Sequence, residues 1–335
     1  MRSIDLGENS IGPESMLKLG ESLKTHVRLH QIFLDNNNLK GELAAEGLSA
    51  ALKHKRDLRV FNIDNNNLGP DGMIKLAESL KAATGLLNLY VFSNNIETEG
   101  AEALAEALQG MEDLKKICLE NNRIKDKGLI AVCKALEKSS ALQSFYIENN
   151  SITDEGAAYL SDMLKNKAKM KKLNISYNGI TDKGMQVVFE SLLPNKNLTL
   201  LNLSKNKMTT ASVESLSAWL LNKTMLEKLY LDGNNIGAEG AMLLADGIID
   251  NTSLMNLHLS NWNIGKEGAR ALSAALGNKK NLLILDLNNN RIQTDGCIAI
   301  MKELKSNTSL IELYLNNNFI DVEGALELAE WLGNK

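Results

Sequence analysis

The sequence is built on one pattern that returns about every 28 residues along the whole chain. The pattern is clearest at 226–240, where the skeleton L-x-x-L-x-L-x-x-N-x-I is followed by a glycine and a helical run. The step between skeleton asparagines is constant, except that one extra residue lies between Asn37 and Asn66, and Trp262 takes the asparagine position between Asn234 and Asn290. The skeleton asparagines are Asn9, Asn37, Asn66, Asn94, Asn122, Asn150, Asn178, Asn206, Asn234, Asn290 and Asn318.

About twelve such repeats account for nearly all of the 335 residues, so the sequence predicts a single repeat domain over 1–335. No segment remains that is long enough for a second domain. The predicted repeats are 1–28, 29–57, 58–85, 86–113, 114–141, 142–169, 170–197, 198–225, 226–253, 254–281, 282–309 and 310–335.

Each repeat divides into a strand half and a helix half. The half L-x-x-L-x-L alternates apolar and polar residues, as a short strand does. The half after the glycine is rich in Ala, Leu, Glu and Lys at helical spacing, as in 100–108. Pro13 and Pro70 suit a first helical turn. An Asp or Thr two residues before the glycine predicts helix N-caps at Thr98, Asp126, Asp154, Asp182 and Thr294.

These halves predict an α/β solenoid. A lone strand and helix cannot bury their apolar faces, so repeats must stack, with a parallel sheet on one side and helices on the other. Neighbouring strands lie ~4.8 Å apart whereas helices need ~10 Å, so the stack has to curve. We therefore expect a horseshoe with its sheet on the concave face and its helices on the convex face.

The repeated asparagine has a structural explanation. Its side-chain amide both donates and accepts, so a column of such residues satisfies backbone groups of adjacent loops. We expect this ladder at Asn37, Asn66, Asn94, Asn122, Asn150, Asn178, Asn206, Asn234, Asn290 and Asn318. The indole of Trp262 donates but cannot accept. Two roles remain open for it, a filler of the loop core or an outward contact point.

Neither end of the repeat array shows the polar cap that a solenoid normally needs. We therefore expect the chain to be a fragment of a longer protein, or its ends to be covered by a partner. The uncapped end repeats also allow end-to-end contacts between chains.

Composition excludes several classes. The net charge is −4, which argues against a broad basic surface for nucleic acid. No apolar run approaches ~20 residues, which predicts no membrane span. The N-terminal residues enter the first strand at once and do not resemble a signal peptide. Three cysteines, Cys118, Cys133 and Cys297, lie far apart, and this favours a reducing cytoplasmic location.

The 28-residue strand-loop-helix repeat, with its I-x-x-x-G-A-x-x-L-A-x-A-L segment, resembles the ribonuclease-inhibitor-like class of leucine-rich repeats. That class includes ribonuclease inhibitor, the sensor domains of NOD-like receptors and the Ran GTPase-activating protein. The resemblance covers the whole chain and implies the fold. Ribonuclease inhibitor alternates two repeat types and is rich in cysteine, whereas this chain has one repeat type, so ribonuclease binding is not implied.

Exposed strand positions are the best candidates for function. One column of these positions is half aromatic or histidine, and the column two residues later carries five acidic residues and no basic one. Aromatic side chains are enriched among interface hot spots, and a carboxylate column steers a basic partner. The candidate partner-binding residues are Phe33, Asp35, Asp64, Tyr90, Phe92, Glu120, Tyr146, Glu148, Tyr230 and Asp232. The alternative is that these residues only pack across strands and keep the surface soluble.

No catalytic motif, nucleotide loop or dinucleotide fingerprint is present, so we expect no enzyme and no cofactor. The four histidines, at 26, 30, 54 and 258, show no metal-binding spacing, so no metal site is expected. The predicted function is a protein–protein interaction module, a sensor or scaffold arm that binds through its concave face. The alternatives are a GTPase-activating protein of the Ran-activator type and a structural spacer.

Overall fold

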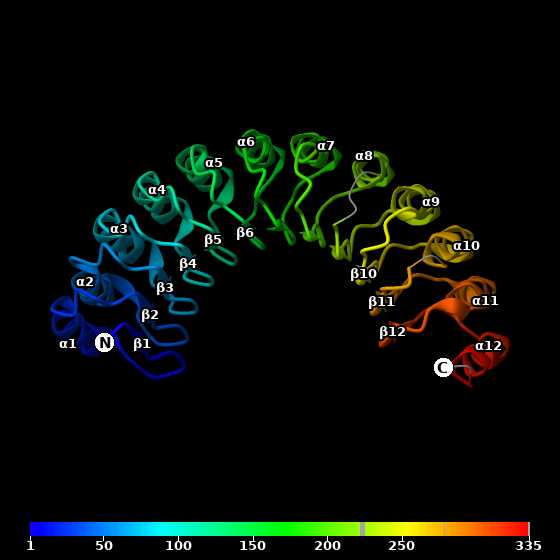
Figure 1. The fold of residues 1–335 in the computed structure, drawn as a ribbon, viewed down its shortest axis with the longest axis horizontal. Coiled ribbons are helices and arrows are strands. Elements are labelled where there is room, and N and C mark those ends of the chain that lie inside the picture. The colour runs from blue at the N-terminus through cyan, green and yellow to red at the C-terminus, as the bar shows by residue number, and fades with distance from the viewer. Residues whose placement is uncertain (222–224, 278, 334–335) are drawn as a thin grey trace. The chain divides into compact units, whose positions relative to one another are not determined.

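The fold is that of a computed structural model, which describes residues 1–221, 225–277 and 279–333. The chain divides into two compact units, Met1–Lys172 and Leu173–Lys335. Each unit is an array of β-α repeats, as the sequence predicts, and Figure 1 shows the helices on one side of each array and the strands on the other. The prediction of a single domain over the whole length stays a prediction.

The first unit runs from β1 to α6. Its strands are parallel, they pair in sequence order, and the same position of each repeat meets its equivalent in the next, as in Asn88↔Lys116↔Ser144. The elements are β1 (Ser3–Asp5), α1 (Pro13–Lys24), β2 (Gln31–Phe33), α2 (Gly41–Leu52), β3 (Val60–Asn62), α3 (Gly69–Leu80), β4 (Asn88–Tyr90), α4 (Glu97–Leu108), β5 (Lys116–Cys118), α5 (Lys125–Leu136), β6 (Ser144–Tyr146) and α6 (Asp154–Leu164).

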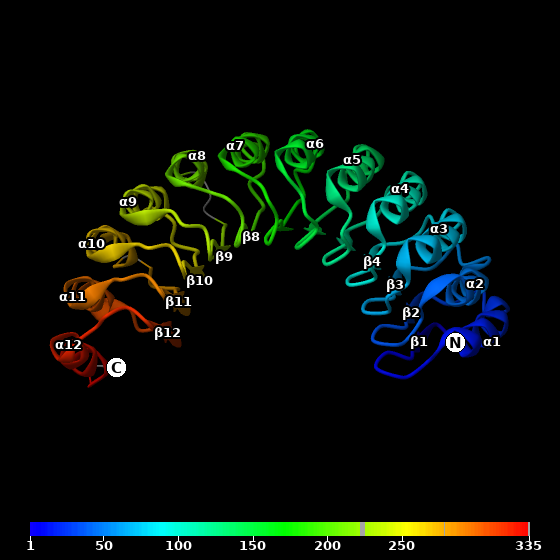
Figure 2. The ribbon, with the colours of Figure 1, turned by 180° about the vertical axis from the view of Figure 1, so that it is seen from behind.

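The second unit repeats this arrangement, and Figure 2 shows it from behind. Its strands from β8 to β12 are again parallel and paired in order. The elements are β7 (Lys172–Asn174), which carries the boundary, α7 (Asp182–Ser191), β8 (Leu200–Asn202), α8 (Thr210–Leu220), β9 (Lys228–Tyr230), α9 (Gly237–Ile248), β10 (Asn256–His258), α10 (Gly265–Leu276), β11 (Ile284–Asp286), α11 (Gln293–Glu303), a 3₁₀ turn (Leu304–Ser306), β12 (Glu312–Tyr314) and α12 (Val322–Gly333).

The core of each unit lies between the sheet and the helices. The central residue of each strand points inward, as Phe61, Leu89 and Phe145 do, and these side chains have no exposed surface. The flanking strand residues point to the opposite face, because side chains alternate along a strand. The sequence alternation therefore fixes which residues are available to solvent or to a partner.

The predicted helix N-caps are wrong. Pro13 is the first residue of α1 and Pro70 the second residue of α3, so both lie in a first helical turn as predicted. The predicted caps are instead the first or second helical residues: Thr98, Asp126, Asp154, Asp182 and Thr294. The reason is that side chains at this position serve the neighbouring repeat. Asp126 accepts hydrogen bonds from the backbone N–H of Thr153 at 2.7 Å and of Gly156 at 3.0 Å. Asp182 accepts the backbone N–H groups of Thr209 and Ser212 in the same way, so both carboxylates satisfy N-terminal N–H groups of the next helix.

Two repeats depart from the regular pattern, and the structure shows how each departure is accommodated. The extra residue of the second repeat is Lys40, so α2 begins four residues after Asn37 whereas α3 begins three after Asn66. The extra residue therefore lies in the loop before α2. In the eighth repeat, Ser212 replaces the loop glycine, is buried and donates its hydroxyl to Asp182.

A left-handed residue precedes each ladder position. These residues have φ between 52° and 68°, a region open to glycine and tolerated by asparagine. Seven of them are asparagine. They are Glu8, Asn36, Asn65, Ser93, Asn121, Asn149, Tyr177, Lys205, Gly233, Asn261, Asn289 and Asn317. The paired asparagines of the sequence therefore have separate roles, one in backbone conformation and one in hydrogen bonding.

Buried lysines close the far ends of several helices. Lys167 donates to the carbonyl oxygens of Leu136 at 2.8 Å and Glu137 at 2.9 Å, and Lys55 and Lys279 occupy the same position in their own repeats. All three are almost fully buried. A cation at a helix C-terminus is favourable because the last carbonyl groups carry partial negative charge.

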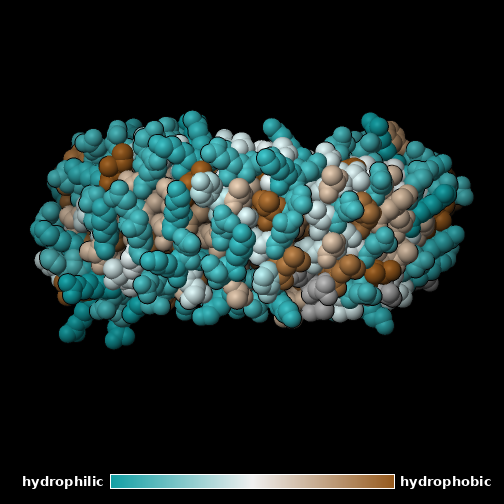
Figure 3. All heavy atoms as spheres, turned by 90° about the horizontal axis from the view of Figure 1, so that it is seen from above, coloured by the Kyte–Doolittle hydropathy of each residue, from teal (hydrophilic) through white to brown (hydrophobic). Residues whose placement is uncertain are grey.

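The helix side is mainly hydrophilic, with separate hydrophobic patches (Figure 3). Partly exposed apolar side chains on the helices include Ile74, Tyr159 and Met242. Along the part of the chain that the structure describes, no helix combines the length and the apolar character needed to cross a membrane.

Candidate functional site

The ladder asparagines bind backbone groups of adjacent repeats. Asn122 shows the pattern, because its Nδ2 donates to the carbonyl oxygens of Val91 at 2.8 Å and Leu119 at 3.0 Å. Its Oδ1 accepts the backbone N–H of Asn94 at 2.9 Å. The side chain is fully buried and has partners for both ends of the amide. These contacts are structural and leave no surface for a ligand.

Trp262 is a core filler. It is fully buried, and its Nε1 donates to the carbonyl oxygen of Leu231 at 2.6 Å. Asn290 donates its Nδ2 to Leu259 at the equivalent position in the next repeat. The indole thus reproduces the donor half of the ladder contact, and its backbone N–H donates to Asn290 Oδ1 at 2.9 Å. Trp262 supplies no side-chain acceptor, so the acceptor half is absent at this step.

A half-buried cluster lies on the strand face of the first unit, and we call it the lysine cluster. Cys118 lies in register between Tyr90 and Tyr146 on the neighbouring strands. Its small side chain leaves space for Lys116, which points to the same face from two residues earlier. Lys116 Nζ lies 4.5 Å from the ring centroid of Tyr90 and 5.2 Å from that of Tyr146. The lysine cluster consists of Tyr90, Lys116, Cys118, Tyr146, Asp64 and Glu120.

The ammonium group is stabilised in this position. Burial lowers the pKa of Lys116, but the attraction of Cys118, Tyr90 and Tyr146 outweighs burial and raises the pKa overall. Both rings offer their negative faces to the cation. Burial raises the pKa of the Cys118 thiol, so this cysteine is not a reactive thiolate.

Two carboxylates of the lysine cluster are held in a crowded environment. Burial, together with Asp64 and Glu148, raises the pKa of Glu120 to about 7, although Lys116 opposes the shift. Burial and Asp35 raise the pKa of Asp64 to about 6, opposed by the hydrogen bond that Asp64 Oδ1 accepts from the N–H of Phe92 at 2.6 Å. Among the described residues, one oxygen of Glu120, Oε2, is buried without a hydrogen-bond partner.

The structure brings six of the predicted contact residues together on adjacent repeats of the first unit: Asp64, Tyr90, Phe92, Glu120, Tyr146 and Glu148. Phe33 and Asp35 lie on the repeat before them, and Asp35 accepts a hydrogen bond from Asn62 Nδ2 at 3.0 Å. Asp35 and Asp64 thus also have structural roles, as their hydrogen bonds link neighbouring repeats.

Tyr230 and Asp232 belong to the second unit and have different neighbours. The ring of Tyr230 packs on the imidazole of His258, with 4.6 Å between ring centroids. Asp232, His258 and Asp286 come from three consecutive repeats, and a potential ligand atom of each lies within 4.8 Å of the others. About one whole repeat separates each of the three from the next in the sequence, which hides this grouping from a search for local histidine spacing.

Four residues of these clusters were not among the predicted contacts: Lys116, Cys118, His258 and Asp286. Cys118, His258 and Asp286 lie in the first exposed column of the sequence, whereas Lys116 occupies the first strand position, outside both columns. The signal for all four is the 28-residue register, because equivalent positions of neighbouring repeats lie side by side in a parallel sheet.

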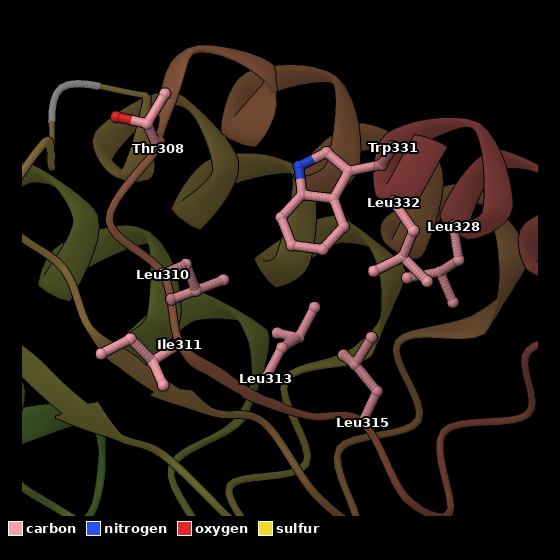
Figure 4. Close-up of a pocket in the computed structure, with 8 residues that line it drawn as sticks. All are labelled: Thr308, Leu310, Ile311, Leu313, Leu315, Leu328, Trp331 and Leu332. Carbon is pink, nitrogen blue, oxygen red and sulfur yellow. The ribbon is translucent and has the colours of Figure 1, made fainter. Parts of the chain in front are cut away.

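An apolar hollow of about 580 Å³ lies between β12 and α12 (Figure 4). Figure 4 shows Leu313 and Leu315 from the strand side and Leu328 and Trp331 from the helix facing one another across it. Ile311 at its edge is 76% exposed. The residues that line the hollow are Thr308, Leu310, Ile311, Leu313, Leu315, Leu328, Trp331 and Leu332.

Comparison with known families identifies the repeat. Nine segments, which together exceed half of the chain, match the Leucine Rich repeat family: 54–77, 86–105, 138–161, 166–189, 195–217, 222–245, 250–273, 278–301 and 306–329. The chain belongs to the leucine-rich repeat family. Its predicted fold class, an α/β leucine-rich repeat solenoid with parallel strands on one face and helices on the other, is therefore confirmed.

One solved structure has a similar fold. The leucine-rich repeat chain is similar to an internalin from Listeria monocytogenes, with a TM-score of 0.50, 17% identity, and coverage of 93% of this chain and 86% of the internalin chain. Leiomodin-1 actin-binding site 2 is also similar, with a TM-score of 0.37, 24% identity, and coverage of 43% of this chain and 86% of the other. A comparison with curated proteins gives no match.

Proposed function

We propose that this leucine-rich repeat protein is a non-enzymatic interaction module that binds a protein partner through the strand face of its first unit. The lysine cluster and its neighbours carry the proposal. They combine aromatic rings, an ammonium group and buried carboxylates. One carboxylate oxygen, Glu120 Oε2, is buried without a hydrogen bond within the described residues. Rigid aromatic surface beside polar groups is the composition of a binding hot spot.

The chemistry favours a basic partner. Burial disfavours the ionised forms of Asp64 and Glu120; the charge of Asp35 adds to this at Asp64, and the charges of Asp64 and Glu148 add to it at Glu120. An arginine or lysine side chain of a partner removes that penalty, because an opposite charge favours the ionised carboxylate. Such a contact also orients the partner and speeds encounter. Binding of this kind is weakened by salt and by protonation of the two carboxylates.

The test compares captured proteins for three forms of the chain. Wild type and the double variant Tyr90→Ala/Tyr146→Ala are used as bait in the same cell lysate, after circular dichroism has shown equal folding. The matched control is Tyr159→Ala on α6, whose ring lies 5.3 Å from the Nζ of Lys134 on the helix face. A partner bound by wild type and by the control, but not by the double variant, supports the strand-face module. Identical captured sets for all three forms contradict it.

We extend the proposal in three respects. The 28-residue period with one helix per repeat supports membership of the ribonuclease-inhibitor-like class. The three widely spaced cysteines, all buried and free, support a cytoplasmic location.

The exposed apolar hollow beside β12 supports end-to-end self-association. Light scattering measures this association, and Ile311→Glu should abolish it. The GTPase-activating alternative has no observation in its favour and stays a prediction.

A further inference from the structure

We infer that Asp232, His258 and Asp286 form a site for a divalent first-row transition metal on the strand face of the second unit. One ligand atom from each side chain lies within 4.8 Å of the other two. A carboxylate–imidazole–carboxylate set offers the oxygen and nitrogen donors that such ions accept. This site is separate from the lysine cluster and does not depend on the proposed partner.

Each carboxylate is oriented by a backbone group. Asp232 Oδ1 accepts the N–H of Ser260 at 2.8 Å, and Asp286 Oδ1 accepts the N–H of Asn288 at 2.9 Å. The second oxygen of Asp286, Oδ2, faces His258 Nδ1 at 3.8 Å, beyond hydrogen-bond distance. Hydrogen bonds of this kind fix metal ligands in place before the ion arrives.

The imidazole is also held in place. The ring of Tyr230 packs against His258 with 4.6 Å between centroids. The side chains of His258 and Asp286 are only 20% and 16% exposed, so the ligands are shielded yet remain open to solvent on one side. Because the three residues come from consecutive repeats of a rigid sheet, the geometry needs no loop to close.

The charge of the cluster favours a cation. Two carboxylates and one imidazole lie together, with one ligand atom of each within 4.8 Å of the others, so the donor set presents more negative than positive charge when the imidazole is neutral. A divalent ion neutralises both carboxylates while the imidazole stays neutral as a ligand. Three protein ligands leave a coordination position open for water or for a group from a partner.

The alternative is a His258–Asp286 ion pair without a metal. The 3.8 Å separation of Nδ1 and Oδ2 is long for a charge-assisted hydrogen bond, which is usually about 2.7–2.9 Å. An ion pair also involves only two of the three residues, whereas Asp232 shares the same space. The metal therefore accounts for all three side chains.

The experiment uses Co²⁺ with the untagged full chain, because Co²⁺ substitutes for Zn²⁺ and absorbs visible light when bound. We expect one Co²⁺ per chain with ligand-field bands in the visible spectrum, displaced by Zn²⁺. The test variant is Asp232→Asn/Asp286→Asn, in which the amide oxygens can still accept the N–H groups of Ser260 and Asn288. His258→Gln is the second test variant.

Both variants should lose the Co²⁺ spectrum and weaken binding at least about tenfold, the smallest effect typical even of an outer-shell change. The matched control is Glu214→Gln, because Glu214 is an exposed carboxylate on α8 of the same unit and belongs to neither cluster, so the Co²⁺ spectrum should be kept. Binding that is absent in wild type overturns the inference. So does binding that survives in both test variants, since the ion then occupies another site such as the remaining histidines.

Discussion

The crowding of carboxylates on the strand face should make folding stability depend on pH through Glu120. The pKa of Glu120 is raised from 4.5 to about 7, mainly by burial. One pKa unit corresponds to about 1.36 kcal/mol, so the difference amounts to about 3 kcal/mol if the group is fully shielded. Glu120 is half-buried and reached by solvent, which reduces the expected effect to about 2 kcal/mol.

The sign follows from proton binding. Between pH 4.5 and about 7 the folded protein keeps the proton on Glu120 while the unfolded chain releases it. Stability therefore falls as pH rises through this window, because the folded state binds more protons. In Glu120→Gln this pH-dependent contribution to the free energy of unfolding is absent. The variant should gain about 2 kcal/mol relative to wild type between pH 4.5 and pH 8.

Urea unfolding followed by circular dichroism at pH 4.5, 6, 7 and 8 measures the difference between variant and wild type. The control is Glu99→Gln, because Glu99 is exposed on α4 and lies outside the crowded carboxylates of the strand face. Asp64, with a pKa of about 6, contributes in the same direction. Asp64→Asn and Glu120→Gln should combine to less than the sum of their separate effects, because each charge influences the other. A difference for Glu120→Gln that is flat, or that shrinks as pH rises, refutes the reasoning.

Three further predictions concern the scaffold. Trp262→Ala should destabilise the chain by about 3–5 kcal/mol in urea unfolding, since it empties a fully buried site. Burial lowers the pKa of Lys279 from 10.5 to about 8, so between pH 8 and 10 the unfolded chain binds more protons than the folded one. Wild-type stability should therefore rise by about 2 kcal/mol over this range, and Lys279→Met should remove the rise. Gly47→Ala should lower the thermal midpoint sharply, because the added Cβ would clash with the backbone carbonyl of Met16, whereas the Cβ of Gly12→Ala meets nothing within 4 Å and should change little.

The repeat period is enough to predict the fold, because every repeat has a strand and a helix whose apolar faces can be buried only against neighbouring repeats. A residue such as Leu89 is apolar, recurs at a fixed step and has only one place to be buried. The fold follows from such positions alone. The left-handed residue before each ladder position was not predicted, and the role of the asparagines found there becomes clear only from the backbone angles.

Contacts between repeats were harder to predict. Asp126 has the chemistry of an N-cap for its own helix, yet it bonds to Thr153 and Gly156 of the next one. Capping propensity describes a residue and its own helix, whereas in a solenoid the N-terminus of the next helix also lies within reach of the side chain. For the same reason Lys116 was missed, because its place between two tyrosines depends on how small Cys118 is.

The longer step at Lys40 shows where the array tolerates changes in length. Side-chain bonds between repeats join residues 25 to 32 positions apart, as in Lys127 to Glu102 and Lys55 to Leu23. Removing or duplicating one whole period preserves every such pairing, whereas a shift of a few residues inside a strand or helix breaks them all at once. One residue was added in the loop before α2, outside the strand register. Length variation among proteins built on this plan is therefore expected in whole repeats or at that loop.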